Sequence, residues 1–149
     1  MKKVVFDIET SNTFQDAGSN DPAALNISVV GIYEYESDKY STFTQEEFGE
    51  LWKIIENIDM FITFNGDHFD IPLLNKYYSG DLFKIKSLDL LKEIQKSAGR
   101  RMKLDQIAEG TLGVNKTGYG LDAEKWWRDG EKEKVKKYCL DDVRITKDL

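Results

Sequence analysis

The order of strand-like and helix-like segments constrains the fold more than any other feature of this 149-residue sequence. Three segments rich in β-branched and aromatic residues come first, at 2–8, 27–35 and 39–43, and a turn at Ser37-Asp38 joins the last two as a hairpin. Helices are then predicted at 44–57, from 67, at 90–97, at 104–112, around Trp126 and from 131 onwards, with strands at 60–64 and 85–88. Strands first, followed by alternating helices and strands, indicate an α/β fold with a mixed sheet covered by helices.

The composition suits a single globular domain spanning residues 1–149, with 40% hydrophobic and 32% charged residues. No signal peptide or membrane-length apolar run is visible, so we expect a cytoplasmic protein. The single cysteine, Cys139, has no partner at the sequence spacing of metal ligands. A net charge of −6 argues against nucleic acid, because affinity for phosphates comes largely from Lys and Arg. A nucleic-acid substrate would therefore need local basic residues or metal ions.

Two acids close the first predicted strand, in the segment Phe6-Asp7-Ile8-Glu9-Thr10. Side chains alternate along a strand, so Asp7 and Glu9 point to the same side, which they share with Val5. Two like charges about 4 Å apart repel by on the order of 4 kcal/mol at an effective dielectric of ~20, and a cation between them reverses the sign. The alternative is a frayed strand end that faces water.

Two further acids lie on predicted helices. Asp70 shares a face with Leu73, Leu74 and Tyr77, so it begins an apolar stripe, although a helix-dipole partner is a serious rival interpretation. Asp67 is better explained as a capping acid. Asp142 lies near the centre of a predicted buried stripe, where an isolated carboxylate is costly unless it is paired or bound to metal. That stripe comprises Val135, Tyr138, Cys139, Asp142, Val143, Thr146 and Leu149. The alternative for Asp142 is a hydrogen bond with Tyr138 in the core.

Together, these segments resemble the three motifs of DEDD exonucleases: Asp7-Ile8-Glu9, Asn65-x-x-x-Phe69-Asp70 and Tyr138-x-x-x-Asp142. The tyrosine is typical of the DEDDy branch, which includes the proofreading domain of family B DNA polymerases; the sister branch has histidine where Lys137 stands. Segments 87–91, 103–113 and 126–130 are also similar to polymerase-type exonucleases, so the resemblance covers nearly the whole chain. It implies a ribonuclease-H-like fold: a mixed five-stranded sheet, with the first three strands antiparallel, and helices on both faces.

The resemblance also implies phosphodiester hydrolysis with two divalent ions, Mg²⁺ or Mn²⁺, about 3.5–4 Å apart. Asp7 would bridge both ions, Glu9 and Asp142 would complete the site that binds the attacking water, and Asp70 would act mainly through coordinated waters. Tyr138 would orient that water. A tyrosine with an ordinary pKa of about 10 is a poor base at neutral pH, so the metal would do most of the acidifying. The product would be nucleoside monophosphates released from 3′ ends.

Contacts with a single-stranded or frayed 3′ end are expected from aromatic and basic side chains and from residues that flank the motifs. These are Thr10, Phe14, Asn65, Phe69, Arg100, Arg101, Lys103 and Tyr119. The basic cluster is equally compatible with ordinary solvated surface, and Phe69 with a core position. Of Trp126 and Trp127, one is expected in the core, and His68 is more simply incidental than catalytic.

DNA is favoured as substrate because the resemblance is to polymerase-type domains, and a polymerase or helicase is the candidate partner in trans. The alternatives are a 3′→5′ exoribonuclease, or a non-catalytic nucleic-acid-binding domain with the same fold.

Overall fold

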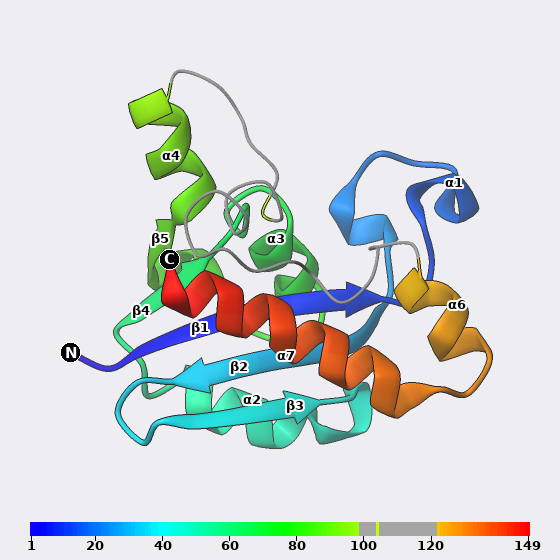
Figure 1. The fold of residues 1–149 in the computed structure, drawn as a ribbon, viewed down its shortest axis with the longest axis horizontal. Helices are drawn as coiled ribbons and strands as arrows, with labels where there is room; N and C mark the ends of the chain where they lie inside the picture. The colour runs from blue at the N-terminus through cyan, green and yellow to red at the C-terminus, as the bar shows by residue number, and fades with distance from the viewer. Residues whose placement is uncertain (99–103, 105–121) are drawn as a thin grey trace.

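The computed structural model describes residues 1–98, 104 and 122–149, and Figure 1 shows its arrangement. Its strands are β1 (Lys3–Thr10), β2 (Ile27–Glu34), β3 (Lys39–Phe43), β4 (Met60–Thr63) and β5 (Lys86–Asp89). Its helices are α1 (Phe14–Ala17), α2 (Phe48–Ile55), α3 (Asp70–Asn75), α4 (Leu90–Ala98), α6 (Asp122–Arg128) and α7 (Lys132–Asp148), with 3₁₀ turns η1 (Pro22–Ala24), η2 (Gln45–Glu47) and η3 (Leu82–Lys84). No helix in this described part combines the length and apolarity needed to span a bilayer.

The strands form one mixed five-stranded sheet in the order β3-β2-β1-β4-β5. β2 pairs antiparallel with both β1 and β3, whereas β4 is parallel to β1 and β5 is parallel to β4. The predicted topology is therefore confirmed, with β1 at the centre. Because β4 is parallel to β1 and β5 is parallel to β4, the carboxyl termini of these three strands lie at the same end of the sheet.

Alternation along β1 divides the core between two layers of helices. Val4, Phe6 and Ile8 belong to a buried cluster that also contains the apolar faces of α2 and α3. On the opposite face, Val5 packs in a cluster with Val143 of α7, which crosses β1 and β2 (Figure 1). Asp7 and Glu9 alternate in phase with Val5, so the sheet presents both acids to the α7 side.

Close packing of α7 on the sheet depends on Gly31 of β2. A Cβ atom at this position would lie 2.9 Å from the Sγ of Cys139 and 3.3 Å from a methyl group of Val143. Only a residue without a side chain leaves room for the helix at its present distance. The missing Cβ therefore lets the buried face of α7 pack on β2 and on β1, the strand that carries Asp7 and Glu9.

The structure corrects several predicted boundaries. The helix predicted at 44–57 is η2 followed by α2, and the segment at 11–26, where no helix was predicted, contains α1 and η1. The α1 helix forms because Thr13 and Asp16 make a capping box. On α7, Ile145 is fully buried and Leu149 is only partly buried, because the last residue lies beyond the helix end. The predicted helix at 104–112 and the loop at 113–120 lie outside the described residues, apart from Leu104.

The helix predicted from Asp67 begins instead at Asp70. Asn65 adopts a left-handed conformation with φ of 66°, which breaks the chain direction after β4. The Asp67 carboxylate does not cap α3, because it accepts hydrogen bonds from Ser87 Oγ at 2.5 Å and Lys92 Nζ at 2.6 Å. Pro72 lies within the first turn of α3, as predicted.

Candidate active site

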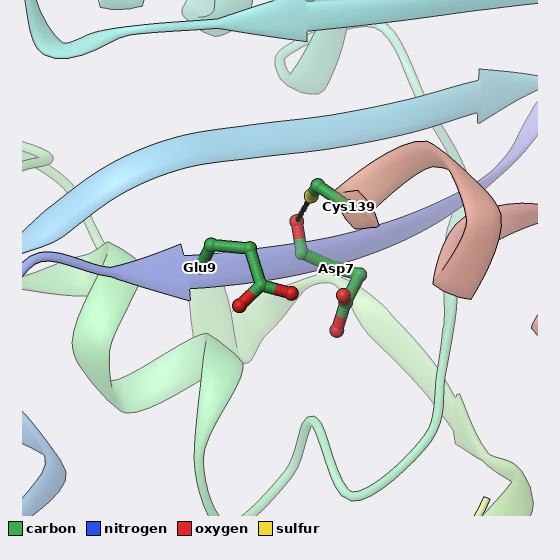
Figure 2. Close-up of side chains that lie close together, drawn as sticks. All are labelled: Asp7, Glu9 and Cys139. Carbon is green, nitrogen blue, oxygen red and sulfur yellow. Dashed lines mark hydrogen bonds between the residues drawn. The ribbon is translucent and has the colours of Figure 1, made fainter. Parts of the chain in front are cut away.

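The two acids of β1 lie near its carboxyl end, where Asp7 pairs with Gly31 and Glu9 with Val29 of β2. Glu9 is buried and Asp7 is partly buried, so the frayed, water-facing strand end is not what the fold forms. Figure 2 shows the side chains of both acids extending from β1, with Cys139 approaching the strand from α7. Two carboxylates thus share the space between the central strand and the last helix.

Cys139 is the residue at this site that the sequence analysis missed. Its Sγ donates a hydrogen bond to the backbone carbonyl of Asp7 at 3.4 Å, and one ligand atom from each of Asp7, Glu9 and Cys139 lies within 4.8 Å of the other two. Burial, followed by the charges of Asp7, Glu9 and Asp142, raises the pKa of the thiol well above its ordinary value. Cys139 therefore remains a protonated thiol that anchors α7 to β1. Its place beside Tyr138 in the buried stripe was the available sequence signal.

Asp142 and Tyr138 both lie on the buried face of α7, as the periodicity predicted. Asp142 is only 6% exposed, and its charge acts on both Cys139 and Asp70. The ring of Tyr138 packs edge-on against Trp126 of α6, with centroids 5.9 Å apart. Trp126 and Trp127 are both partly buried, so neither is the fully buried core residue predicted for one of them. Both pack against a core cluster that comprises Val29, Ala123, Val135, Tyr138 and Cys139.

Asp70 is the first residue of α3 and is 3% exposed. Burial raises its pKa well above 3.8, and the charges of Asp89 and Asp142 raise it further. A carboxylate that served as a helix-dipole partner would show the opposite shift, because a helix N-terminus stabilises negative charge. The Oδ2 atom is buried and meets no hydrogen-bond partner within residues 1–98, 104 and 122–149. The fold thus places Asp70 where its negative charge is costly.

These observations link four carboxylates from three elements. Asp7 and Glu9 from β1 and Asp142 from α7 all act on the same thiol, and Asp142 also acts on Asp70 from α3. Carboxylate oxygens are the ligands that Mg²⁺ and Mn²⁺ prefer, and the buried Oδ2 of Asp70 leaves acceptor capacity for a cation. The donor set therefore fits hard divalent ions, while the protonated Cys139 does not contribute a ligand suited to them.

Two of the predicted nucleic-acid contacts lie side by side. Phe14 of α1 is 36% exposed, and its ring meets that of Phe69 edge-on with centroids 6.1 Å apart. Phe69 immediately precedes Asp70 and is partly buried against the cluster that contains Val4, Phe6 and Ile8, so the core alternative for Phe69 remains beside the predicted contact. Thr10 donates a hydrogen bond from its hydroxyl to Glu124 Oε1 of α6 at 3.2 Å.

Of the remaining predicted contacts, Asn65 lies within the described residues. The backbone N–H of Asn65 donates to the carboxylate of Asp89, so this residue is held by the end of β5. His68 is exposed. The rest lie outside the described residues: Arg100, Arg101, Lys103 and Tyr119.

Comparison with known proteins agrees with this architecture. The chain is similar to the family B DNA polymerase from the hyperthermophilic archaeon Pyrobaculum calidifontis, with a TM-score of 0.73 and 18% identity over 98% of this chain. It spans 23% of the length of that polymerase chain. Curated protein sequences give no match. A family model described as the RNase_H superfamily matches residues 4–149, which supports a nuclease-type activity. The sheet topology, the acidic site and the family match lead to one conclusion: this chain belongs to the RNase_H superfamily.

Proposed function

We propose that this protein is a metal-dependent 3′→5′ exonuclease that releases nucleoside monophosphates from the 3′ ends of nucleic acid, with DNA as the favoured substrate. The observation that carries the proposal is that the charges of Asp7, Glu9 and Asp142 all act on Cys139, and that Asp142 also acts on Asp70. Such a set of buried carboxylates is unfavourable for folding, because like charges repel in a medium of low dielectric constant. Binding of cations to the same carboxylates offsets that cost and gives the cluster a function.

Asp7, Glu9, Asp70 and Asp142 would together hold two divalent ions, Mg²⁺ or Mn²⁺, which supply activation of water and stabilisation of the departing 3′-oxygen. Asp70 suits this role because its buried Oδ2 has acceptor capacity left. Tyr138 would orient the attacking water through its phenol group, since its ring is fixed against Trp126 on the buried face of α7. Fixing the ring reduces the freedom that the hydroxyl must lose in the transition state.

The aromatic pair formed by Phe14 and Phe69 supports an activity at strand ends. Aromatic faces bind bases by stacking without reading their sequence, at roughly 1–3 kcal/mol per base. Phe69 precedes Asp70 directly, and Phe14 remains partly exposed beside it. A terminal nucleotide stacked on this pair would bring its phosphodiester bond close to the carboxylates. Asn65 and Thr10 flank the same region and would contact the terminal sugar or base.

The test is incubation with 5′-labelled single-stranded DNA and RNA of one sequence, with EDTA, Mg²⁺ or Mn²⁺. We expect a ladder that shortens stepwise from the 3′ end, only with metal, with nucleoside monophosphates as products. A 3′-phosphate should block the reaction, because the terminal hydroxyl end has to enter the site. Faster shortening of RNA would reassign the substrate to RNA.

Two variants on α7 form a matched pair for this assay. Asp142→Asn should abolish cleavage, because it removes one of the converging carboxylates. Asp141→Asn should retain it, because Asp141 is on another face of the helix, 3.9 Å from the guanidinium of Arg144.

Cutting of circular single-stranded DNA at a comparable rate would make the protein an endonuclease. Binding of the strand without any cleavage would leave a non-catalytic nucleic-acid-binding domain.

A further inference from the structure

A further buried acid, Asp89, is the last residue of β5 and lies at the same end of the parallel strands as the two acids of β1. It is 4% exposed, and it pairs with Thr63 of β4 in the parallel ladder. Its carboxylate accepts three backbone hydrogen bonds. Oδ1 accepts from Leu91 N at 3.0 Å and from Asn65 N at 2.8 Å, and Oδ2 accepts from Asp67 N at 3.3 Å.

Capping of α4 explains only one of these bonds. The bond from Leu91 is the ordinary contact between a side chain at a helix start and the N–H groups of the first turn. The bonds from Asn65 and Asp67 instead cross to the segment between β4 and α3, more than twenty residues earlier in the chain. Both oxygens of the carboxylate are used, whereas an asparagine would offer a single carbonyl acceptor.

The segment that Asp89 holds has an unfavourable backbone. Asn65 has φ of 66°, which an L-residue rarely adopts. At Gly66, a Cβ atom would lie 2.2 Å from Oγ1 of Thr63, the same hydroxyl that accepts a hydrogen bond from the Gly66 N–H at 3.1 Å. A chain in this conformation needs fixed partners to persist, and Asp89 supplies two of them.

The position of Asp70 follows from this segment through two hydrogen bonds. The Phe69 N–H donates to the carbonyl of Asn65 at 3.1 Å, and the Ile71 N–H donates to the carbonyl of Gly66 at 2.8 Å. The residues on either side of Asp70 are thus hydrogen-bonded to Asn65, which Asp89 holds, and to Gly66, which lies between Asn65 and Asp67. Movement of Asn65 would be transmitted directly to the backbone of Asp70.

Capping of α4 does not require a negatively charged residue at position 89. Asp89 stands close enough to Asp70 that its charge, after burial, helps to raise the pKa of Asp70. A residue that served only to cap α4 would avoid that repulsion, because serine, threonine or asparagine caps a helix about as well as aspartate. The Asp67 side chain adds a second attachment of the same segment, to Ser87 of β5 and Lys92 of α4.

We propose that Asp89 is a positioning residue of the acidic site: by holding Asn65 and Asp67 it sets where the Asp70 carboxylate meets the bound metal. The predicted effect of Asp89 on cleavage rests on the proposed function, whereas its predicted effect on metal affinity rests on metal binding alone. Hydrogen-bond partners that orient metal ligands commonly matter by about 10–100-fold in affinity or activity. Asp89 itself touches neither substrate nor reacting atoms.

The test compares the parent with Asp89→Asn, Asp89→Ser and the control Asp81→Asn. Ser at position 89 keeps a capping hydroxyl for Leu91 but lacks the reach to Asn65 and Asp67. Asp81 caps the exposed turn η3 through Phe83 N at 3.0 Å, so its variant repeats the chemical change away from the site. Mn²⁺ affinity is measured by calorimetric titration of the metal alone, and cleavage of single-stranded DNA is measured for kcat and KM.

We expect Asp89→Asn and Asp89→Ser to remain folded and to bind Mn²⁺ about 10–100-fold more weakly, with kcat lowered by a similar factor. KM should change less than kcat, because the substrate contacts remain, and higher Mn²⁺ should restore part of the rate. Asp81→Asn should match the parent. Parent-like Mn²⁺ affinity and kcat in a folded Asp89→Ser variant would reduce Asp89 to a helix cap and overturn the inference.

The same measurements separate this inference from the proposed function. A parent that binds Mn²⁺ but does not cleave DNA or RNA would refute the exonuclease, while weaker Mn²⁺ binding by Asp89→Ser would still support positioning. A parent without Mn²⁺ binding would overturn both. Should Asp89→Asn fail to fold, Asp89→Ser carries the test, because it retains the cap of α4.

Discussion

Replacing Asp70 with Asn should raise the melting temperature of the metal-free protein while it abolishes cleavage. The side chain is 3% exposed, its pKa is raised first by burial and then by the charges of Asp89 and Asp142, and asparagine has nearly the same shape. Two like charges about 4–8 Å apart repel by roughly 2–4 kcal/mol at an effective dielectric of ~20. After relaxation we expect the variant to gain about 1–3 kcal/mol, which corresponds to about 2–12 °C for a chain of this size.

The pH dependence of this gain follows from the direction of the pKa shift. The folded pKa of Asp70 lies above its ordinary value of 3.8, so the parent carries the cost of the charge in full only above that raised pKa. As the pH falls through the raised pKa toward the ordinary one, Asp70 protonates in the folded protein and the cost disappears. The advantage of Asp70→Asn should therefore be present at neutral pH and shrink in acid.

Divalent metal should reverse the order of stabilities. At a hundredfold excess over Kd, Mn²⁺ should stabilise the parent by about 2.7 kcal/mol, and the variant should gain less. Thermal melts of the parent, Asp70→Asn and Asp81→Asn, in EDTA and in millimolar Mn²⁺, provide the measurement. If Asp70 instead supports the start of α3, its variant would lose about 0.3–1 kcal/mol under both conditions. That loss, with a parent indifferent to Mn²⁺, would refute the metal-site reasoning.

Four further predictions concern other parts of the molecule. Tyr138→Phe should fold and bind Mn²⁺ like the parent but turn over roughly 10–10³-fold more slowly in single-turnover assays, and unchanged turnover would make Tyr138 a packing residue. Gly31→Ala should cost about 1–3 kcal/mol in urea melts, because its Cβ meets Cys139 at 2.9 Å, whereas Gly49→Ala in α2, with nothing within 4 Å, should gain about 0.5–1 kcal/mol. Burial alone would raise the pKa of Asp67, but hydrogen bonds from Lys92 and Ser87 lower it below 3.8. The stability that these hydrogen bonds contribute is therefore present above pH ~3.8 and is lost as the pH falls through the lowered pKa. In urea unfolding, Lys92→Gln should be less stable than the parent at pH ~6 and should reach the same midpoint as the parent in acid. Gln in place of Arg100, Arg101 and Lys103 together should weaken DNA binding and flatten its salt dependence without changing turnover at saturation, and parent-like binding at low salt would mark these residues as ordinary surface.

The acidic composition no longer counts against a nucleic-acid substrate once the location of the acids is known. Under the proposed function, part of the net charge of −6 belongs to Asp7, Glu9, Asp70 and Asp142, where bound cations would offset it. Net charge is a property of the whole chain, whereas affinity depends on the charges near the bound strand. The prediction drawn from net charge alone therefore does not decide against a nucleic-acid substrate.

Local periodicity was sufficient for the features that a single element decides. Alternation along β1 placed Asp7 and Glu9 on the side of Val5, and the 3.6-residue period placed Tyr138 and Asp142 on the buried face of α7, as the structure has them. These predictions succeed because backbone geometry fixes which face a side chain occupies, whatever the rest of the fold does. The order of elements likewise predicted the mixed sheet, since few arrangements bury strands and helices in that sequence.

The tertiary structure alone decided how those faces meet. Asp67 looked like a helix cap, but the ladder between β4 and β5 brings Ser87 and Lys92 to its carboxylate, and the same ladder aligns Asp89 with the turn at Asn65. The contact of Cys139 with the Asp7 carbonyl joins residues 132 positions apart, and it needs the space that Gly31 leaves. Such contacts depend on strand register and on the approach of one element to another. No pattern within a short window of sequence encodes either of them, because both arise from packing between distant segments.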